Sequence, residues 1–224
     1  MEPIDLVIFD FDGVLVDSET ISAGMLMAEL ARHGVEIDRA YVARHFLGRS
    51  YPVVLNQIRA EFGVVLPEGF EADYRARLMA AFQKDLQIMP GVRGVLERLA
   101  VPFCLATSSS RPRLEHSLAI VGLAETFAER VTTASEVARG KPAPDLFLRA
   151  AEKAGARAGR CLVIEDSLTG IAAARAAGMA VWRFTGGSHL AGIDVAPDPA
   201  APPDLEFASF DKFFHLAPWL ERQG

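Results

Sequence analysis

Two aspartates separated by one residue follow a short apolar segment near the start of the chain. Asp10 and Asp12 come directly after residues 4–9, and Gly13 follows them. A carboxylate can attack phosphorus and carry the phosphoryl group as an aspartyl-phosphate. A second carboxylate two residues on can give a proton to the leaving group and then take one from water. The pair therefore indicates phosphoryl transfer.

Taken alone, the same pair is also typical of a polar turn after a strand. It does not fit an EF-hand calcium loop, because Val14 stands where a third oxygen ligand is needed and no glutamate follows at the right spacing. The interpretation therefore depends on polar groups elsewhere in the chain.

Such groups follow two other predicted strands or lie between them: Thr107, Ser108, Ser109, Ser110, Lys141, Glu165 and Asp166. Ligands of parallel sheets bind at the carboxyl ends of the strands, so we expect these groups to meet at one edge. Clustered carboxylates repel unless a cation joins them, and hard oxygen ligands suit Mg²⁺. Hydroxyls, backbone N–H groups and a lysine are the donors that a phosphoryl group needs. The sequence predicts a site for Mg²⁺ and a phosphate ester.

Nearby polar residues have competing interpretations. Ser109 and Ser110 either contact substrate or cap the helix that follows, and Arg111 is expected to be exposed at the start of that helix. The five histidines are dispersed without metal-ligand spacing and are expected to be structural or solvated; they are His33, His45, His116, His189 and His215.

The elements that position these residues alternate between strand and helix from residue 90 onward. Predicted strands cover 4–9, 101–106, 130–133, 160–164 and 180–184, and predicted helices cover 18–31 (capped by Ser18), 92–99, 114–121, 145–154, 168–177 and 210–220, with a loop at 193–204. Repeated strand–helix units imply an α/β fold, a Rossmann-like parallel sheet with helices on both faces.

Residues 38–86 differ, because their apolar positions recur at helical spacing and no strand-like alternation occurs. We expect a small all-helical cap domain, residues 18–86, inserted after the first strand. The α/β hydrolase core then comprises residues 1–17 and 87–224.

The 224 residues are half apolar and 23% charged, as in globular proteins. A net charge of −6 without a Lys/Arg run argues against a nucleic-acid partner. No apolar run is long enough to span a membrane, and no leader pattern is seen, so we expect a cytoplasmic protein. Cys104 and Cys161 lie in apolar runs and are expected to be buried free thiols. A monomer or weak homo-oligomer is expected.

The motifs resemble those of the haloacid dehalogenase-like hydrolase superfamily, in the same order and over essentially the whole chain. Residues 10–18 resemble its first signature, Thr107 its second, Lys141 its third, and Glu165-Asp166 its fourth. Residues 142–145 and 165–171 resemble the β-phosphoglucomutase-like branch in particular.

The resemblance implies a role for each matched residue. Asp10 is the expected nucleophile and a Mg²⁺ ligand. Asp12 is the expected general acid and base, and its backbone carbonyl also binds the metal. Thr107 and the backbone of Ser108 are expected to hold the transferring phosphate, which Lys141 bridges to Asp10.

Asp166 is expected to bind the metal directly or through water, with Glu165 as its companion. The cap loop Gly48-Arg49-Ser50 is expected to close over the site and to select the substrate.

The function favoured is a Mg²⁺-dependent phosphatase acting on a small-molecule phosphate ester, a sugar phosphate or sugar-acid phosphate. A phosphosugar mutase of the β-phosphoglucomutase type is the alternative. That enzyme carries a cap lysine and a cap arginine where this chain has Leu47 and Tyr51, although Arg49, Arg75 or Arg77 offer substitutes.

Other classes fit the residues less well. Dehalogenases of this superfamily lack the second aspartate, which is present here as Asp12. A phosphonatase needs a cap lysine, and Lys84 lies near the hinge. A binding protein on an inactive scaffold is disfavoured because nucleophile, acid and lysine are all retained.

Overall fold

The computed structural model describes residues 3–193 and 195–223. Within them the strands form one six-stranded, entirely parallel sheet in the order β3-β2-β1-β4-β5-β6. The strands are β1 Leu6–Phe9, β2 Phe103–Thr107, β3 Val131–Thr133, β4 Cys161–Glu165, β5 Ala180–Phe184 and β6 Leu205–Phe207. From β1 the chain first adds β2 and β3 on one side, and then adds β4, β5 and β6 on the other side. Strand β1 therefore lies between β2 and β4.

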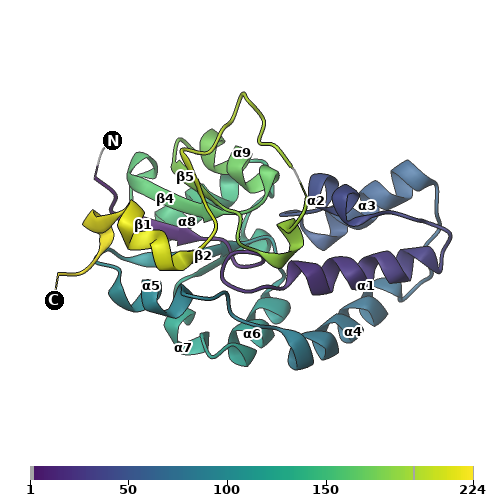
Figure 1. The fold of residues 1–224 in the computed structure, drawn as a ribbon. Coiled ribbons are helices and arrows are strands. Elements are labelled where there is room, and N and C mark those ends of the chain that lie inside the picture. The colour runs from purple at the N-terminus through teal and green to yellow at the C-terminus, as the bar shows by residue number, and fades with distance from the viewer. Residues whose placement is uncertain (1–2, 194, 224) are drawn as a thin grey trace.

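Ten α-helices occur within the described ranges: α1 Glu19–Ala31, α2 Arg39–His45, α3 Tyr51–Phe62, α4 Phe70–Asp85, α5 Val92–Arg98, α6 Arg111–Ile120, α7 Ala124–Phe127, α8 Asp145–Lys153, α9 Leu168–Ala176 and α10 Phe213–Leu216. Helices α1 to α4 lie together beyond one end of the sheet, while the others surround it (Figure 1). None of the helices described is long and apolar enough to cross a membrane.

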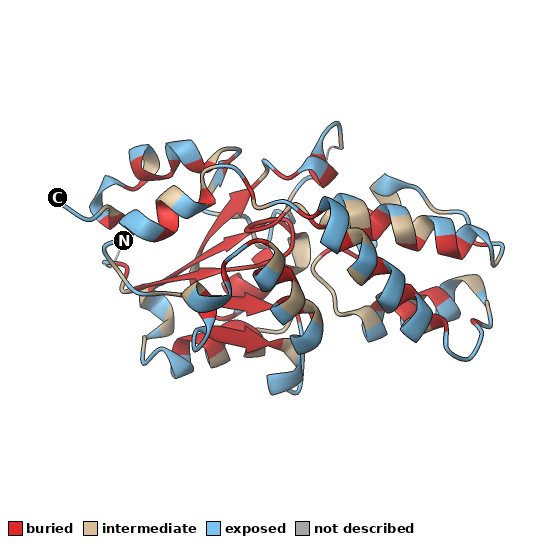
Figure 2. Ribbon diagram, turned by 90° about the horizontal axis from the view of Figure 1, so that it is seen from below, coloured by how far each residue is buried: buried red, intermediate tan, exposed pale blue. Residues whose placement is uncertain are grey.

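Successive side chains of a strand point to opposite faces of the sheet, and β1 shows the result. Leu6 and Ile8 pack in a cluster with apolar residues of α8 and α9. Val7 and Phe9 belong to a second cluster that includes residues of α5, α6 and α10. The sheet is therefore buried on both faces, as the red strands of Figure 2 show. The predicted α/β fold with helices on both faces is confirmed.

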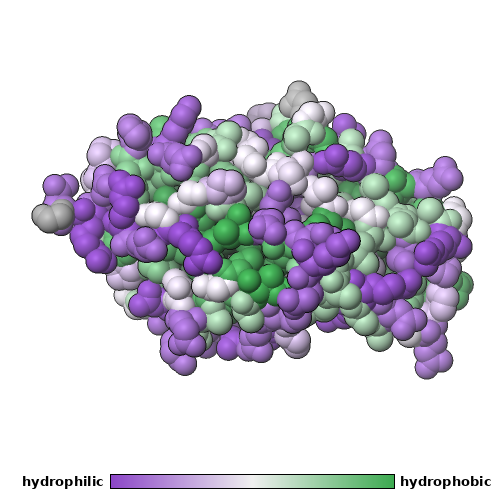
Figure 3. All heavy atoms as spheres, turned by 60° about the horizontal axis from the view of Figure 1, so that its bottom comes forward, coloured by the Kyte–Doolittle hydropathy of each residue, from purple (hydrophilic) through white to green (hydrophobic). Residues whose placement is uncertain are grey.

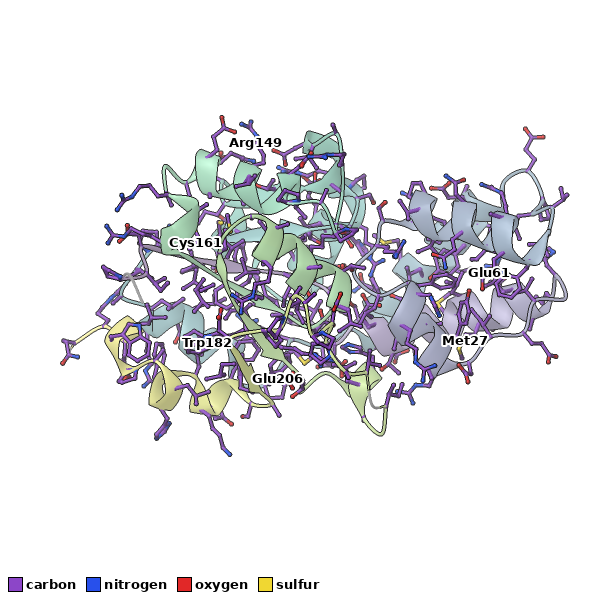
Figure 4. The ribbon with its side chains drawn as sticks, turned by 90° about the horizontal axis from the view of Figure 1, so that it is seen from above. Met27, Glu61, Arg149, Cys161, Trp182 and Glu206 are labelled. Carbon is purple, nitrogen blue, oxygen red and sulfur yellow. The ribbon has the colours of Figure 1, made fainter. Side chains whose placement is uncertain are left out.

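The second cluster continues from the sheet into the helices α1 to α4. Each of these helices turns a buried side toward its neighbours and an exposed side toward solvent (Figure 2). Figure 4 places Met27 and Glu61 among these helices and Cys161 and Trp182 in the sheet region. Figure 3 shows a largely hydrophilic face with an apolar area near its middle.

The C-terminal part differs from the prediction. The helix expected over 210–220 is wrong, because this stretch divides into the 3₁₀ turn Phe210–Lys212, helix α10 and the 3₁₀ turn Pro218–Leu220. Pro218 lacks an N–H and disfavours helical geometry in the residue before it, and Ala217 indeed has φ −133°. The short elements β6 and α7 were not predicted. Asp194, in the predicted loop 193–204, lies outside the described residues.

Cys104 and Cys161 are buried and unpaired, as expected. Arg111 is exposed at the first position of α6 and pairs with Glu115, which also agrees with the prediction.

Candidate active site

The register of the sheet brings the predicted site residues to one edge. Phe9, the last residue of β1, lies beside Leu105 of β2 and Ile164 of β4. Asp10 therefore emerges between the end of β2, where Thr107 lies, and the end of β4. The backbone N–H of Asp10 donates to the carbonyl of Ile164 at 2.9 Å and fixes this start of the loop.

Lys141 joins two carboxylates at this edge. Its Nζ donates to Asp10 Oδ1 at 2.9 Å and to Glu165 Oε1 at 2.5 Å, and its side chain is fully buried. The other oxygen of Glu165 accepts from the backbone N–H and the hydroxyl of Ser167, the N-cap residue of α9. Removing one partner of a buried ion pair costs about 3–5 kcal/mol, so Lys141 is structurally important as well.

Asp166 lies beside this pair, and its carboxylate has no conventional partner. Both oxygens are buried and accept no hydrogen bond. Ligand oxygens of Asp10, Glu165 and Asp166 lie within 4.8 Å of one another. Three carboxylates face one ammonium group, which leaves a negative charge that a divalent cation would balance. These residues fit a hard cation with oxygen ligands.

The titration behaviour leads to the same conclusion. Burial raises the pKa of Asp10 well above its ordinary value, and the charges of Glu165 and Asp166 raise it further, against the lowering effect of Lys141. Burial and the charge of Glu165 also raise the pKa of Asp166. A cation at the cluster would favour the ionised forms and thereby make Asp10 a competent nucleophile.

Asp12 lies in a separate polar environment next to this cluster. Its carboxylate accepts hydrogen bonds from Ser18 Oγ at 2.6 Å, Ser109 Oγ at 2.5 Å and Arg113 Nη2 at 2.6 Å. Burial alone would raise the pKa of Asp12, but the charge of Arg113 and these hydrogen bonds lower it. Asp12 is thus held ionised, with its oxygens directed toward the start of α1 and α6.

The contacts of three serines near Asp12 differ from simple helix capping. Ser18 occupies the N-cap position of α1, but its side chain makes no capping bond to the helix, so the predicted capping role is wrong. Ser109 binds Asp12 instead of capping α6. Ser110 is the N-cap residue of α6 without a side-chain capping bond, and it accepts from Arg75 Nη1 at 3.4 Å.

Two hydrogen bonds hold the loop before α3 to residues that follow β2 and β4. Ser108 Oγ donates to the carbonyl of Gly48 at 2.8 Å, and Thr169 Oγ1 donates to the carbonyl of Leu47 at 3.0 Å. Gly48 has φ +73°, and a Cβ there would lie 2.1 Å from Ser167 Oγ. The contact between this loop and the start of α9 therefore requires glycine at this position.

A pocket of about 370 Å³ lies between the sheet edge and the helices α1, α3 and α4. Asp10, Asp12, Thr107, Ser108 and Ser109 line it from the sheet side. The walls from the helical side and from α6 carry both charge and aromatic surface, and include Glu19, Arg49, Tyr51, Tyr74, Arg75 and Arg113.

The arginines of this pocket differ in how they are held. The Nε atoms of Arg49 and Arg75 are buried without hydrogen-bond partners. Arg75 lies over the ring of Tyr51, which stacks on Tyr74. Arg75 also pairs with Glu71 but lines the pocket, whereas Arg77 pairs with Glu29 and is not among the residues that line it. Arg77 therefore does not offer the substitute considered from the sequence.

Three residues near the site escaped sequence reasoning. Arg113 lies two positions after Arg111 in α6 and therefore faces a different side of the helix, toward Asp12. Glu19 follows the first motif directly, and its position in the pocket was not inferred. His189 was expected to be structural or solvated, yet its Nε2 lies 2.8 Å from Asp166 Oδ2. No spacing signal links residues 23 positions apart, and only the three-dimensional arrangement shows this contact.

Comparison with known families agrees with this geometry. The model of the haloacid dehalogenase-like hydrolases matches residues 4–178. The chain belongs to this family. Among curated relatives of this hydrolase, the 6-phosphogluconate phosphatase of Escherichia coli strain K12 is 28% identical over 191 residues, which cover 84% of this chain and 86% of the relative.

Solved structures show the same relationship. A conserved haloacid dehalogenase-like protein from Agrobacterium tumefaciens is 33% identical with a TM-score of 0.79, covering 96% of this chain and 98% of that one. A putative β-phosphoglucomutase from Bacteroides vulgatus is 26% identical with a TM-score of 0.73, covering 98% and 91%. The expected branch of the hydrolase superfamily is confirmed.

Proposed function

We propose that this hydrolase is a Mg²⁺-dependent phosphatase that cleaves a small phosphorylated metabolite through an aspartyl-phosphate. The observation that carries the proposal is the buried group of Asp10, Lys141 and Asp166, of which Asp10 also lines a pocket that contains several hydroxyl groups. Asp10, Glu165, Asp166 and the backbone carbonyl of Asp12 are the proposed holders of Mg²⁺. When bound, the ion supplies positive charge that offsets the charge of the phosphoryl group.

In the proposed reaction an oxygen of Asp10 attacks phosphorus in line, and the bond from phosphorus to the leaving oxygen breaks. Thr107, the backbone N–H of Ser108 and Lys141 hold the phosphoryl oxygens. Asp12, which is ionised before the substrate binds, takes up a proton when the anionic phosphate ester binds next to it and raises its pKa. Asp12 donates this proton to the leaving oxygen. It then accepts a proton from the water that hydrolyses the aspartyl-phosphate and regenerates Asp10.

The proposed domain division follows from the same contacts. Residues 18–86 form a helical cap over a core of residues 1–17 and 87–224, and the loop at Gly48 and Arg49 closes the pocket. Closure excludes bulk water from the aspartyl-phosphate.

The proposed substrate is a sugar phosphate or sugar-acid phosphate. Arg49 and Arg75 line the pocket from the helical side, and the Nε atom of each is buried without a hydrogen-bond partner, while Nη2 of Arg75 pairs with Glu71. They favour a substrate with oxygen-rich or anionic groups remote from its phosphate. The relative named 6-phosphogluconate phosphatase is consistent with this choice.

A phosphosugar mutase of the β-phosphoglucomutase type is the second candidate, and the similarity to a putative β-phosphoglucomutase favours it. The position of Leu47 argues against it, because this side chain is buried and its carbonyl binds Thr169. Incubation with β-glucose 1-phosphate distinguishes the two: a phosphatase releases inorganic phosphate, and a mutase forms glucose 6-phosphate.

The phosphatase proposal predicts that Asp10→Asn lowers hydrolysis of phosphate esters about a thousandfold or more, because an amide is a poor nucleophile. Release of phosphate from p-nitrophenyl phosphate and from 6-phosphogluconate, with Mg²⁺ present, measures the effect. Asp73→Asn, at an exposed position of α4, is the matched control and should retain activity. Full activity of the Asp10 variant would contradict the mechanism.

A further inference from the structure

His189 is a buried histidine for which the proposed reaction has no use. It lies in the 3₁₀ turn Ser188–Leu190 after β5, and only 5% of its surface is exposed. Its Nε2 lies 2.8 Å from Oδ2 of Asp166, a carboxylate oxygen that accepts no other hydrogen bond. A buried imidazole at this distance from a proposed metal ligand calls for a function.

The backbone leaves room for the imidazole on two sides. A Cβ on Gly13 would lie 2.2 Å from Asp166 Oδ2 and 3.0 Å from His189 Cε1. A Cβ on Gly187 would lie 2.5 Å from His189 Cε1. Both glycines are needed for this packing, so the contact between ring and carboxylate is built into the local backbone.

Hydrogen bonds with Asp17, just before α1, and with Arg39 of α2 also hold the turn that carries His189. Ser188 Oγ donates to Asp17 Oδ1 at 2.8 Å, and the Ser188 backbone N–H donates to the same oxygen at 3.2 Å. Arg39 of α2 donates to the carbonyl of Ser188 at 3.1 Å. The ring is therefore mounted on a fixed turn, as a residue that orients a metal ligand must be.

The polar atoms of the pair are not yet satisfied. Neither nitrogen of His189 and neither oxygen of Asp166 forms a hydrogen bond of normal geometry, although all four atoms are buried. An unpaired buried polar group costs about 1–3 kcal/mol, so such a pair is expected to be completed by another partner. A cation on one oxygen of Asp166 and the N–H of His189 on the other would satisfy the carboxylate.

His189 contacts the carboxylate of Asp166 but does not lie among the residues that could bind the cation directly. The described residues whose ligand atoms lie within 4.8 Å of one another are Asp10, Glu165 and Asp166, and His189 is not among them. Two ligands of one Mg²⁺ are at most about 4.2 Å apart, because each lies about 2.1 Å from the ion. His189 therefore meets Asp166 from outside the set.

We propose that His189 is a positioning residue for the cation site: its Nε2–H donates to Oδ2 of Asp166 and presents Oδ1 to the divalent cation. The inference rests on the proposed Mg²⁺ dependence. Outer partners that orient metal ligands typically change metal affinity about 10–100-fold when removed.

Calorimetric titration of the purified protein with Mg²⁺ tests this role without measuring turnover. His189→Leu keeps the bulk but removes the donor, and should bind Mg²⁺ about tenfold more weakly or worse. His189→Gln places an amide nitrogen near the position of Nε2 and should retain most of the affinity. His189→Asn places it near Nδ1 and should behave like the leucine variant. His215→Leu, at an exposed histidine, is the matched control.

A double-mutant cycle with Asp166→Asn identifies the residue through which His189 acts. Because Asp166→Asn is expected to abolish Mg²⁺ binding, the cycle is measured as melting temperatures without Mg²⁺. The change caused by His189→Leu should be smaller once Asp166 is replaced, whereas a packing defect that does not involve Asp166 would persist. Melting temperatures without Mg²⁺ report whether each variant folds. If the leucine variant does not fold, the difference in Mg²⁺ affinity between the Gln and Asn variants still tests the role of His189. Equal Mg²⁺ affinity of wild type, Leu and Asn variants overturns the role of His189 alone. Absence of Mg²⁺ binding by the wild type overturns the proposed cofactor as well.

Discussion

Asp12 and Glu19 affect each other's charge but are held in opposite protonation states. Asp12 is kept ionised by Arg113 and two serine hydroxyls, and its charge helps to raise the pKa of Glu19. Burial is the larger cause for Glu19, whose pKa rises to about 8. At neutral pH Glu19 is therefore largely protonated and able to donate a hydrogen bond to a substrate oxygen in the pocket.

The raised pKa of Glu19 predicts a stability that depends on pH. The unfolded chain releases this proton near 4.5 and the folded protein near 8, so the folded state binds more protons in between. Glu19 therefore does not lower the free energy of unfolding below about pH 4.5, where it is protonated in both states. The free energy of unfolding falls as the pH rises from there toward 8. Glu19→Gln should raise the melting temperature at about pH 8.5 and change it little at about pH 4.5.

Thermal unfolding at the two pH values measures this difference. Glu68→Gln, at an exposed position before α4, serves as the control and should show no such dependence. An equal change in melting temperature at both pH values would argue that the proton on Glu19 is not the cause.

At the residue scale, motif spacing predicted which side chains meet but not which atoms bind which. Asp10, Lys141 and Glu165 were expected together, and they are in contact. Arg113 and His189 were missed because their partners lie about 100 and 23 positions away, and neither helical nor strand periodicity reports such pairs.

At the scale of elements, the order of the sheet explains why the site forms where it does. Asp10, the proposed nucleophile, follows the central strand β1. The hydroxyl residues 107–110 lie at the end of β2, and the pair Glu165-Asp166 lies at the end of β4. Short continuous apolar runs predicted these strands well, since each strand is buried on both faces. The short strand β6 and the divided C-terminal helix could not be predicted from the sequence, because three or four residues are too few to show a strand or helix periodicity.

The junction between the loop before α3 and the sheet supplies a prediction at this scale. Gly48→Ala adds a methyl group at φ +73° and 2.1 Å from Ser167 Oγ. The loop must then shift by an ångström or so, which typically costs about a hundredfold in rate. Steady-state kinetics with the best phosphate ester should show this loss in kcat/KM.

Gly63→Ala is the matched control for backbone strain. Gly63 also has a positive φ, +64°, but a Cβ there meets nothing within 4 Å. Both variants should lose similar stability, while the Gly63 variant keeps its activity. If both lose activity equally, strain rather than the cap contact is responsible.

For the molecule as a whole, the composition predicted a globular protein, and the sheet with its two apolar clusters agrees. The placement of the cap helices against the sheet did not follow from composition or periodicity, because it depends on side chains that meet across the pocket. The family resemblance supplied that arrangement in outline.

Divalent cation binding should stabilise the chain as a whole, since the proposed ligands lie at the ends of both β1 and β4. A ligand at a hundred times its Kd adds about 2.7 kcal/mol to the free energy of unfolding. For a protein of this size that corresponds to a rise of about 5–10 °C in melting temperature. Thermal melts with EDTA and with saturating Mg²⁺ measure it. The rise should disappear in Asp166→Asn, and persistence there would place the cation elsewhere.

The two hydrogen bonds that hold the loop before α3 have a consequence for substitutions within this loop. Ser108 and Thr169 hold the loop through the carbonyl oxygens of Gly48 and Leu47, which every amino acid possesses. Side chains at the following positions, Arg49 to Tyr51, can therefore be exchanged during evolution or in a mutant library without unfastening the loop. Substitutions at these three positions are therefore expected to leave both hydrogen bonds in place.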